Sequence, residues 1–342
     1  MIAVIDCGTT HTRLYIIDDS GSTVAQGKKK IGVRDTSITG SRDALRNGLR
    51  DLFEEVLASA GIAKNRVDFA VSSGMITSEI GLMEIPHLVA PVSGKDLADN
   101  IVEVNDPAVV PLGVPILFIR GIRNNYGDNV RLSSIRRVDF MRGEEVQCMG
   151  IADWGLLPPP LNLVVLSSHT KIIHIDADKR VRGCITTLSG QIYEALLKAT
   201  SIGKSLIDND SQEPGGYNDD EIMNIAAESV ENAGIVRTLL MPRFMEVLLK
   251  TGSHERQVFA NAAIAADDMK AFDEFASLGF GCENYILFGH ESRCEMYTAM
   301  LRRKFPNAKV ASVSDENDLN AITTAGTLSV LRAAGRTAIP AS

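Results

Sequence analysis

Short apolar runs separated by polar turns open the chain. Residues 2–5 are apolar, and a polar segment at 6–11 separates them from a second apolar run at 13–17. A turn rich in Asp, Ser and Gly at 18–22 precedes a third run near 24–31. Apolar runs bounded by such turn residues are typical of strands, so the pattern predicts a three-stranded meander.

The same pattern returns in the middle of the chain. Apolar runs at 161–166, 171–175 and 181–188 are separated by polar turns at 167–170 and 176–179. Two meanders with a polar loop between their first two strands predict two homologous lobes. The alternative is a coincidental similarity between two unrelated hairpin segments.

Helical spacing of apolar residues follows each meander. Residues 41–60 carry leucine, phenylalanine and valine on one helical face, with Ser41 as a candidate N-cap. Similar spacing predicts helices at 191–199, 221–233, 237–249, 254–275, 292–303 and 318–333, and short apolar runs predict strands at 67–72, 285–288 and 309–312. Strands that alternate with helices are typical of the α/β class.

Composition narrows the class of partner. At 342 residues, with 45% hydrophobic and 23% charged residues, the chain fits a globular protein of two domains. Nucleic acids and anionic membranes attract basic surfaces, and single-stranded nucleic acids also stack on aromatic side chains. A net charge of −8 and a single tryptophan therefore predict no nucleic acid and no membrane as partner. We expect a small-molecule ligand.

Cysteine usage and hydropathy bear on location. The five cysteines are scattered and form no C-x-x-C pair, which favours reduced thiols in a cytoplasm and disfavours a structural zinc site. No apolar run approaches the roughly 20 residues of a membrane-spanning helix. An aspartate follows the first residues too early for a secretory signal. We expect a cytoplasmic protein.

The first polar loop has the composition of a phosphate-binding turn. Gly8, Thr9 and Thr10 combine an accessible backbone with hydroxyl donors, and Asp6 at the end of the first strand can hold a Mg²⁺-bound water. Arg13 lies on the next strand, where most charges are simply solvated. A hairpin turn without a ligand explains the same residues.

The second polar loop repeats this arrangement. Ser167 and Ser168 occupy the turn, and Lys171 directly after it can balance phosphate charge. Two such loops can bind one polyphosphate. Gly289, after the strand at 285–288, would let an adenine or ribose approach closely, although a plain β-turn is an equal alternative.

Two further segments carry candidate chemistry. Glu144 follows an Arg-Gly pair and begins a helical pattern, so it could take a proton from a substrate hydroxyl, with Asp139 as the second candidate. Capping of the helix explains one of the two adjacent glutamates without any ligand. Ser73, Gly74 and Met75 follow a strand, a position that suits a hydroxyl-rich ligand or, alternatively, a helix cap.

Taken together, these segments resemble the 2-dehydro-3-deoxygalactonokinase family of the actin/hexokinase/Hsp70 ATPase superfamily. The sequence FMRGEEVQ at 140–147 is very near the MRGEE-x-Q signature, and IDCGTTHTR at 5–13 resembles the D-W-G-[ST]-[ST]-x-x-R opening. SGMI at 73–76 resembles the G-M segment near the sugar, and 320–326 resembles the closing connector helix.

The resemblance implies a fold and a division of the chain. The fold would be a two-lobed actin-like ATPase (ribonuclease H-like) α/β fold, with duplicated mixed sheets flanked by helices and an interlobe cleft. The expected lobes are 1–142, with the first phosphate loop and the sugar segment, and 143–342, with the second phosphate loop and the adenosine loop. The last helix, 318–333, would pack back toward the first lobe.

The resemblance also implies an activity. It implies ATP-dependent phosphorylation of a keto-deoxy sugar acid such as 2-dehydro-3-deoxy-galactonate, with Mg²⁺ as the metal cofactor and catalysis mostly by positioning and charge neutralisation. Glu144 would be the base, and Arg142 would lie beside the sugar and is one candidate for its carboxylate, with Arg120 as another. A homodimer is left open as the assembly.

Departures from the family pattern support two alternatives. The family's second loop reads P-G-T-H-x-K where this chain has LSSHTK at 166–171, and a carboxylate of the family's M-T-G-E is replaced by Gln191. A non-catalytic sugar- or nucleotide-binding relative is therefore the main alternative. A phosphatase of the same superfamily is a third interpretation, and the MRGEE segment speaks against it.

Overall fold

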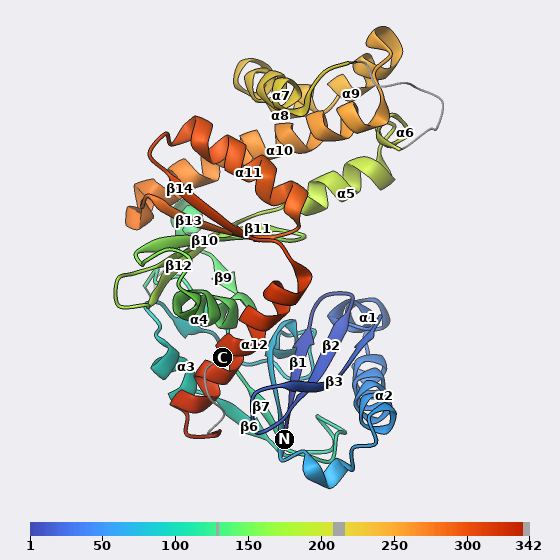
Figure 1. Ribbon diagram of the computed structural model, residues 1–342, viewed down its shortest axis with the longest axis vertical. Helices are drawn as coiled ribbons and strands as arrows, with labels where there is room; N and C mark the ends of the chain where they lie inside the picture. Colours follow the sequence, from blue (N-terminus) through green and yellow to red (C-terminus); the bar gives the residue numbers. More distant parts are fainter. Residues whose placement is uncertain (128–129, 208–215, 338–342) are drawn as a thin grey trace. The chain divides into compact units, whose positions relative to one another are not determined.

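The computed structural model describes residues 1–127, 130–207 and 216–337, and the chain divides into two compact units. Unit 1 comprises Met1–Pro160, His174–Cys184 and Asn320–Ser342, and unit 2 comprises Leu161–Ile173 and Ile185–Leu319. The first stretch of unit 1 thus extends beyond the expected boundary at 142, because the helix that follows Gly143 packs within unit 1. Figure 1 labels the helices and strands.

A six-stranded sheet forms the centre of unit 1, in the order β3-β2-β1-β4-β7-β6. Its strands are β1 (Ile2–Cys7), β2 (Thr12–Ile17), β3 (Thr23–Lys29), β4 (Phe69–Gly74), β6 (Val102–Val104) and β7 (Ile116–Phe118). The first three form an antiparallel meander, as the sequence predicts, and β1, β4 and β7 are parallel. Leu49 and Phe53 of α2 (Asp43–Ser59) are buried in the core of this unit.

Several elements of unit 1 have no counterpart in the sequence analysis. They are α1 (Val33–Thr39), α3 (Gly94–Asp99), the strands β6 and β7 of the large sheet, and the strands of a small three-stranded sheet, β5 (Leu88–Val89), β8 (Ile122–Arg123) and β9 (Phe140–Met141). Strands of two residues are too short to show an alternation of apolar and polar positions. The small sheet nevertheless supports the residues that precede Gly143.

Two helices of unit 1 contact each other backbone to backbone. They are α4 (Glu144–Trp154) and the part of α12 (Glu316–Ala333) that belongs to this unit. A side-chain carbon at Gly150 would overlap the carbonyl of Ile322, and one at Gly326 would overlap the carbonyl of Val146. The two glycines therefore set the close approach of these helices.

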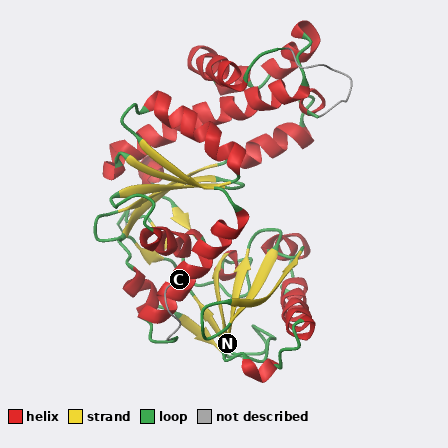
Figure 2. Cartoon of the chain, viewed as in Figure 1, coloured by secondary structure: helices red, strands yellow, loops and turns green. Residues whose placement is uncertain are grey.

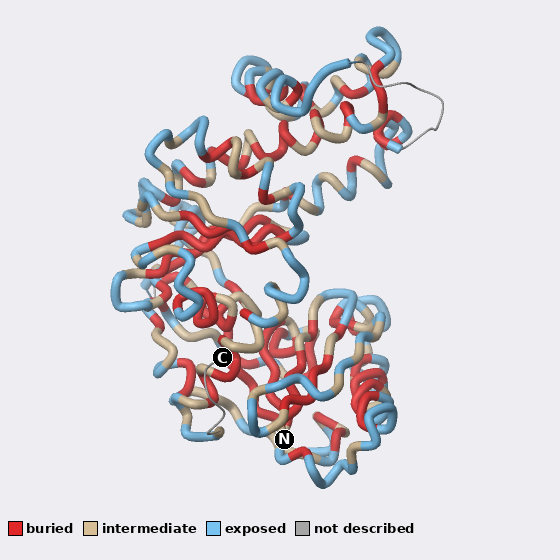
Figure 3. The backbone as a smooth tube through the Cα atoms, viewed as in Figure 1, coloured by how far each residue is buried: buried red, intermediate tan, exposed pale blue. Residues whose placement is uncertain are grey.

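The second sheet repeats the strand order of the first. It runs β12-β11-β10-β13-β14, a meander followed by two further strands, and β10, β13 and β14 are parallel. The strands are β10 (Leu161–Leu166), β11 (Thr170–Ile175), β12 (Val181–Thr187), β13 (Asn284–Gly289) and β14 (Lys309–Val313). Figure 3 shows the central strands as buried, and Figure 2 shows helices flanking them. The predicted α/β fold with duplicated mixed sheets is confirmed.

Helices make up most of unit 2. They are α5 (Ser189–Ala199), α6 (Gly203–Leu206), α7 (Asp219–Ala233), α10 (Ser253–Phe275) and α11 (Glu291–Lys304). The prediction of one helix at 237–249 is wrong: the segment contains α8 (Ile235–Thr238), α9 (Met241–Phe244) and a π-helical turn at Met245–Leu249. Pro242 lacks the N–H that a continuous helix needs, so a new helix begins there. Among the described residues, no helix is both long enough and apolar enough to span a bilayer.

Candidate functional site

In unit 1, the candidate residues of the first strand lie at its carboxyl end. Asp6 of β1 is paired with Arg13 on β2 and with Ser73 on β4. Arg13 Nη1 donates to Asp6 Oδ2 at 3.3 Å, and the Asp6 side chain is 45% exposed. Among the described residues, no donor bonds to Oδ1 of Asp6, so this oxygen is available to a ligand.

The loop after β1 is closed on itself and held by α1. The Gly8 N–H donates to the His11 carbonyl at 2.9 Å, and the N–H groups of Val33 and Arg34 donate to the carbonyls of Gly8 and Thr9. These bonds occupy the carbonyls of the loop. Thr9 and Thr10 are exposed and offer N–H and hydroxyl donors at its tip, as a phosphate-binding turn requires.

The end of β4 meets the start of α4 at two glycines. Gly74 has φ +88° and Gly143 has φ +107°, values that side-chain-bearing residues rarely adopt. A side-chain carbon built on Gly143 would lie 3.4 Å from the Gly74 Cα. Backbone contact at this point brings Glu144, the first residue of α4, next to the strand end that carries Ser73.

Arg142 is fixed by a hydroxyl that sequence reasoning did not single out. Its Nη1 donates to Thr77 Oγ1 at 2.7 Å and its Nη2 donates to the Ile85 carbonyl at 2.8 Å. Thr77 is fully buried, and its own hydroxyl donates to the Gly74 carbonyl at 2.9 Å. Arg120 donates to the Pro86 carbonyl in the same segment. Both arginines are thus anchored at residues 85–86, and burial lowers the pKa of Arg142.

The two adjacent glutamates have different surroundings. Glu145 is completely buried, and its Oε2 accepts from the Gly143 N–H at 2.7 Å. Burial, and then the charge of Glu144, raises the pKa of Glu145 to about 8. Glu145 thus caps the helix. Glu144, the first residue of α4, is half-buried, and its Oε2 is buried.

Two other predicted residues of this unit have local contacts. Asp139 precedes β9, and its Oδ1 accepts from the Phe140 N–H at 2.7 Å and lies 3.8 Å from the Cys184 thiol. Met75 packs partly buried against the hydrophobic core of unit 1. Its apolar contacts give a packing reason for the side chain, in addition to the role expected from the sequence.

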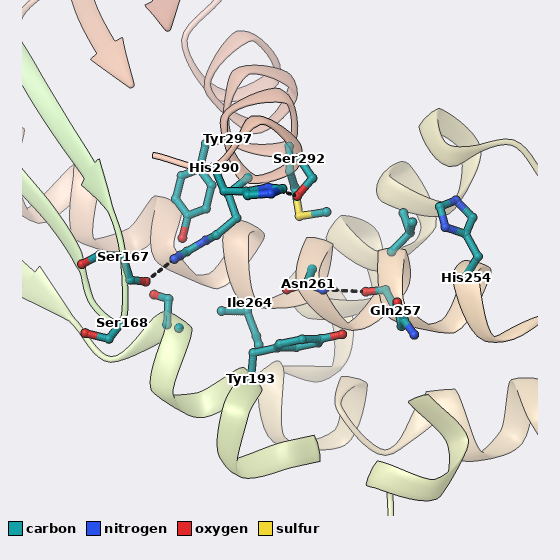
Figure 4. A pocket seen from close by; sticks show the side chains of 15 residues that line it. Ser167, Ser168, Tyr193, His254, Gln257, Asn261, Ile264, His290, Ser292 and Tyr297 are labelled. Carbon is teal, nitrogen blue, oxygen red and sulfur yellow. Dashed lines mark hydrogen bonds between the residues drawn. The ribbon is translucent and has the colours of Figure 1, made fainter. Parts of the chain in front are cut away.

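Unit 2 contains a cavity of about 530 Å³, which Figure 4 shows from close by. This volume is typical of small-molecule sites. Ser167 and Ser168 of the β10–β11 turn lie at one end, and His254 and Gln257 of α10 lie at the other. The remaining lining residues come from α5, α10, α11 and the residue before α11, and are Ser189, Gly190, Tyr193, Val258, Asn261, Ile264, His290, Ser292, Arg293, Met296 and Tyr297.

The second polar loop is fixed by the helix that follows the meander. The Gln191 N–H donates to the Ser168 carbonyl at 2.9 Å, and the absence of a side chain at Gly190 lets α5 approach the Ser167 carbonyl. Gly289 ends β13 with no room for a side chain next to the Leu166 carbonyl, and His290 after it lines the cavity. The turn and the end of β13 therefore border one cavity.

Lys171 is not among the residues that line this cavity. The side chain is buried, and its Nζ donates to Thr186 Oγ1 at 2.8 Å. The basic residue that lines the cavity is Arg293, whose Nη1 donates to the Ser167 carbonyl. The sequence feature that could have identified Arg293 is its position as a basic residue at the start of the helix that follows Gly289.

A magnesium ion would find a limited set of ligands in unit 1. Within the described residues, no group of three His, Cys, Asp or Glu side chains could hold a metal ion. Asp6 offers one exposed carboxylate oxygen. Mg²⁺ prefers oxygen ligands and keeps several waters when it is bound together with substrate phosphates. A single carboxylate therefore fits a magnesium ion that phosphates and water largely hold.

The chain matches the family model described as 2-keto-3-deoxy-galactonokinase over residues 6–325. It is 24% identical over 239 residues to "Probable 2-dehydro-3-deoxygalactonokinase DgoK1" of Rhizobium meliloti (strain 1021), covering 70% of this chain and 69% of that protein. It is 26% identical over 136 residues to the 2-dehydro-3-deoxygalactonokinase of Escherichia coli (strain K12), covering 40% of each protein.

The solved structure "Crystal structure of a putative 2-dehydro-3-deoxygalactonokinase protein from Sinorhizobium meliloti" superposes with a TM-score of 0.72 at 18% identity, covering 96% of both chains. At this identity the similarity shows a shared fold. The family match covers both candidate regions, the Asp6 and Glu144 segments of unit 1 and the cavity of unit 2. The chain belongs to the 2-keto-3-deoxy-galactonokinase family and is a sugar-acid kinase.

Proposed function

We propose that this chain transfers the γ-phosphoryl group of ATP to a hydroxyl of 2-dehydro-3-deoxygalactonate. The observation that carries the proposal is Glu144, a half-buried residue that begins α4 beside the contact between Gly143 and Gly74. The family match supports the reaction class. In phosphoryl transfer the protein contributes mainly by positioning the reactants and neutralising charge.

The nucleotide would bind in the cavity of unit 2. The turn at Ser167 and Ser168 would take phosphate oxygens, and the end of β13 at Gly289 would lie near the adenosine. In unit 1, the loop of Gly8, Thr9 and Thr10 keeps N–H and hydroxyl donors of the kind that suit a phosphate, with Arg13 beside Asp6. Magnesium neutralises phosphate charge when it is bound, and Asp6 would hold it through a water.

The sugar acid would bind in unit 1, next to Ser73 and Gly74. Glu144 would accept the proton of the hydroxyl that is phosphorylated, which makes that oxygen a better nucleophile. Glu145 is buried and capped on the Gly143 N–H, so it would hold the start of α4 and remain neutral near neutral pH. Arg142, anchored by Thr77, would supply positive charge for the carboxylate of the sugar acid.

Turnover tests the role of Glu144. We would measure ADP release from ATP over a panel of keto-deoxy sugar acids for the wild-type protein, for Glu144→Gln, and for Glu54→Gln on the exposed side of α2 as the matched control. Loss of a general base lowers kcat by about 10²–10⁴-fold. We expect this loss for Glu144→Gln with sugar binding retained, and no change for Glu54→Gln. Full turnover by Glu144→Gln would remove Glu144 from the role of base.

A non-catalytic binding relative is the second candidate. The specific observation in its favour is the pair of exposed serines, Ser167 and Ser168, where the family has a glycine in the second loop. Such a protein would be stabilised against heat by the sugar acid without consuming ATP, because a ligand that binds only the folded state raises its stability. Sugar-dependent ADP release would exclude this candidate.

A further inference from the structure

The cavity of unit 2 carries a positive charge and no negative charge on its lining. None of its described lining residues is an aspartate or a glutamate, although the chain as a whole has a net charge of −8. His254 at the far end is paired with Asp219 at 3.0 Å. Arg293 has no ion pair with any described acidic residue. An arginine that is not neutralised in a cavity favours an anionic ligand.

Arg293 lies directly against the turn of the second polar loop. Its Nη1 donates to the Ser167 carbonyl, and its Nη2 donates to Thr170 Oγ1 at 3.1 Å. A guanidinium has five N–H donors, so donors remain after these two bonds. The planar arrangement of these donors matches two oxygens of a phosphate.

Arg293 packs against a buried hydrogen-bond network. The Arg293 guanidinium lies over the Tyr297 ring, 5.6 Å from its centroid. The Tyr297 hydroxyl donates to Asp268 Oδ2 at 2.5 Å and lies 2.9 Å from Thr170 Oγ1, and Ser189 also donates to Asp268. Burial raises the pKa of Tyr297, which keeps its hydroxyl protonated as a donor.

This network joins four elements that surround the cavity. Thr170 begins β11, Ser189 begins α5, Asp268 belongs to α10 and Tyr297 belongs to α11. A cation that is fixed in advance by such contacts loses little freedom when its ligand binds, and preorganisation of this kind is typical of binding sites. The position next to the Ser167 turn places the cation at the phosphate end of the cavity, away from Gln257 and His254.

We propose that Arg293 binds the terminal phosphates of the nucleotide in this cavity, and that the Asp268–Tyr297–Thr170 network positions it. Lys171, the basic residue that the sequence suggested for this task, donates to Thr186 and does not line the cavity. The inference deepens the proposed function and rests on it, since it assumes that the cavity binds ATP.

Isothermal titration calorimetry with ATP, ADP and adenosine tests the inference on the full chain. The variants are Arg293→Ala, Arg293→Gln, which keeps hydrogen-bonding capacity but removes the charge, and Arg302→Ala on an exposed face of α11 as the matched control. A charge-assisted hydrogen bond corresponds to about 10–100-fold in affinity. We expect that loss for ATP and ADP in both Arg293 variants, adenosine binding within about twofold of wild type, and no change in the control.

Tyr297→Phe tests whether the network positions Arg293. This change removes the hydroxyl that joins Asp268 to Thr170, so the KM for ATP should rise while the KM for the sugar acid stays unchanged. Equal ATP affinity in wild type and Arg293→Gln would overturn this inference but not the proposed nucleotide site. An equal loss of adenosine binding would also overturn it, because Arg293 would then act on the whole cavity. A wild-type protein that binds no ATP would overturn the proposed nucleotide site together with the inference.

Discussion

The buried carboxyl of Glu145 makes a testable link between pH and stability. The side chain has no exposed surface, and Oε1 of Glu145 has no hydrogen-bond partner among the described residues, whereas Oε2 accepts from the Gly143 N–H. Glu145→Gln keeps the shape and the acceptor for Gly143 but cannot ionise. The comparison of the two proteins therefore isolates the ionisation of one group.

The direction of the change of stability with pH follows from the raised pKa of Glu145. The pKa of Glu145 is about 8 in the folded protein, against an ordinary value of 4.5. Between these two pH values the unfolded chain loses this proton and the folded chain keeps it, so the free energy of unfolding falls as pH rises. The slope is about 1.4 kcal/mol per pH unit. Over the whole interval the loss is about 5 kcal/mol, and outside the interval this group adds no pH dependence.

Urea unfolding followed by circular dichroism at pH 5, 6, 7 and 8 measures the effect. The amide of the glutamine is buried without a partner and costs about 1–3 kcal/mol at every pH. We therefore expect Glu145→Gln to be less stable than wild type at pH 5 and to gain relative stability at each higher pH. Other titrating groups are common to both proteins and cancel in the difference.

Glu144→Gln serves as the control for the cause of the shift. The charge of Glu144 is the second cause of the raised pKa of Glu145, after burial. Removal of the Glu144 charge should bring the pKa of Glu145 closer to its ordinary value. The pH interval over which stability falls should then be narrower but still present. A difference between wild type and Glu145→Gln that is the same at pH 5 and pH 8 would show that Glu145 ionises normally, and the reasoning would fail.

Three further variants test single contacts. Gly74→Ala should lower the unfolding free energy by about 1–3 kcal/mol because of the φ of +88°, and should reduce kcat, while Gly61→Ala, at φ +65° with open space around it, should affect stability alone. Thr77→Val should raise the KM for the sugar acid about tenfold, since Arg142 loses a hydroxyl acceptor, and leave the KM for ATP unchanged. Asn124→Ala should cost about 2–4 kcal/mol in urea unfolding, because it leaves the buried backbone N–H and carbonyl of Cys184 without their partner; unchanged stability would contradict the role of that pair.

The meanders and the longer helices could be predicted because their patterns are local. The apolar runs at 2–5 and 161–166 lie in β1 and β10, which are almost fully buried, and their turns carry strong breakers. The helix predicted at 254–275 has apolar residues at helical spacing and is observed as α10. Each of these elements is determined largely by its own residues.

The segment between β4 and α4 could not be predicted in the same way. It contains strands of two or three residues, such as β8 and β9, whose pairing depends on partners elsewhere in the chain. The role of Thr77 depends on Arg142, 65 residues later in the chain. Neither a period nor a local motif marks such a contact.

The same limit applies to the basic residue of the cavity in unit 2. Lys171 follows the turn in sequence and was the natural candidate, but its strand is buried and its Nζ is bonded to Thr186. Arg293 contacts the same turn from 126 residues away, through the packing of α11. By contrast, the sequence already indicates that the two adjacent glutamates have different roles, because helix capping needs only one of them. Glu145 is the one that makes the capping bond.

The composition of unit 1 from three separate stretches has a consequence for synthesis on the ribosome. Its last stretch begins at Asn320, so residues 1–160 emerge long before the part of α12 that covers Gly150 and Val146. At about 5–20 residues per second, the intervening roughly 160 residues take about 10–30 s to translate. During that time α4 has an uncovered apolar side in the nascent chain. Unit 2 comes later in the sequence, yet its last residue, Leu319, is translated before unit 1 can be completed.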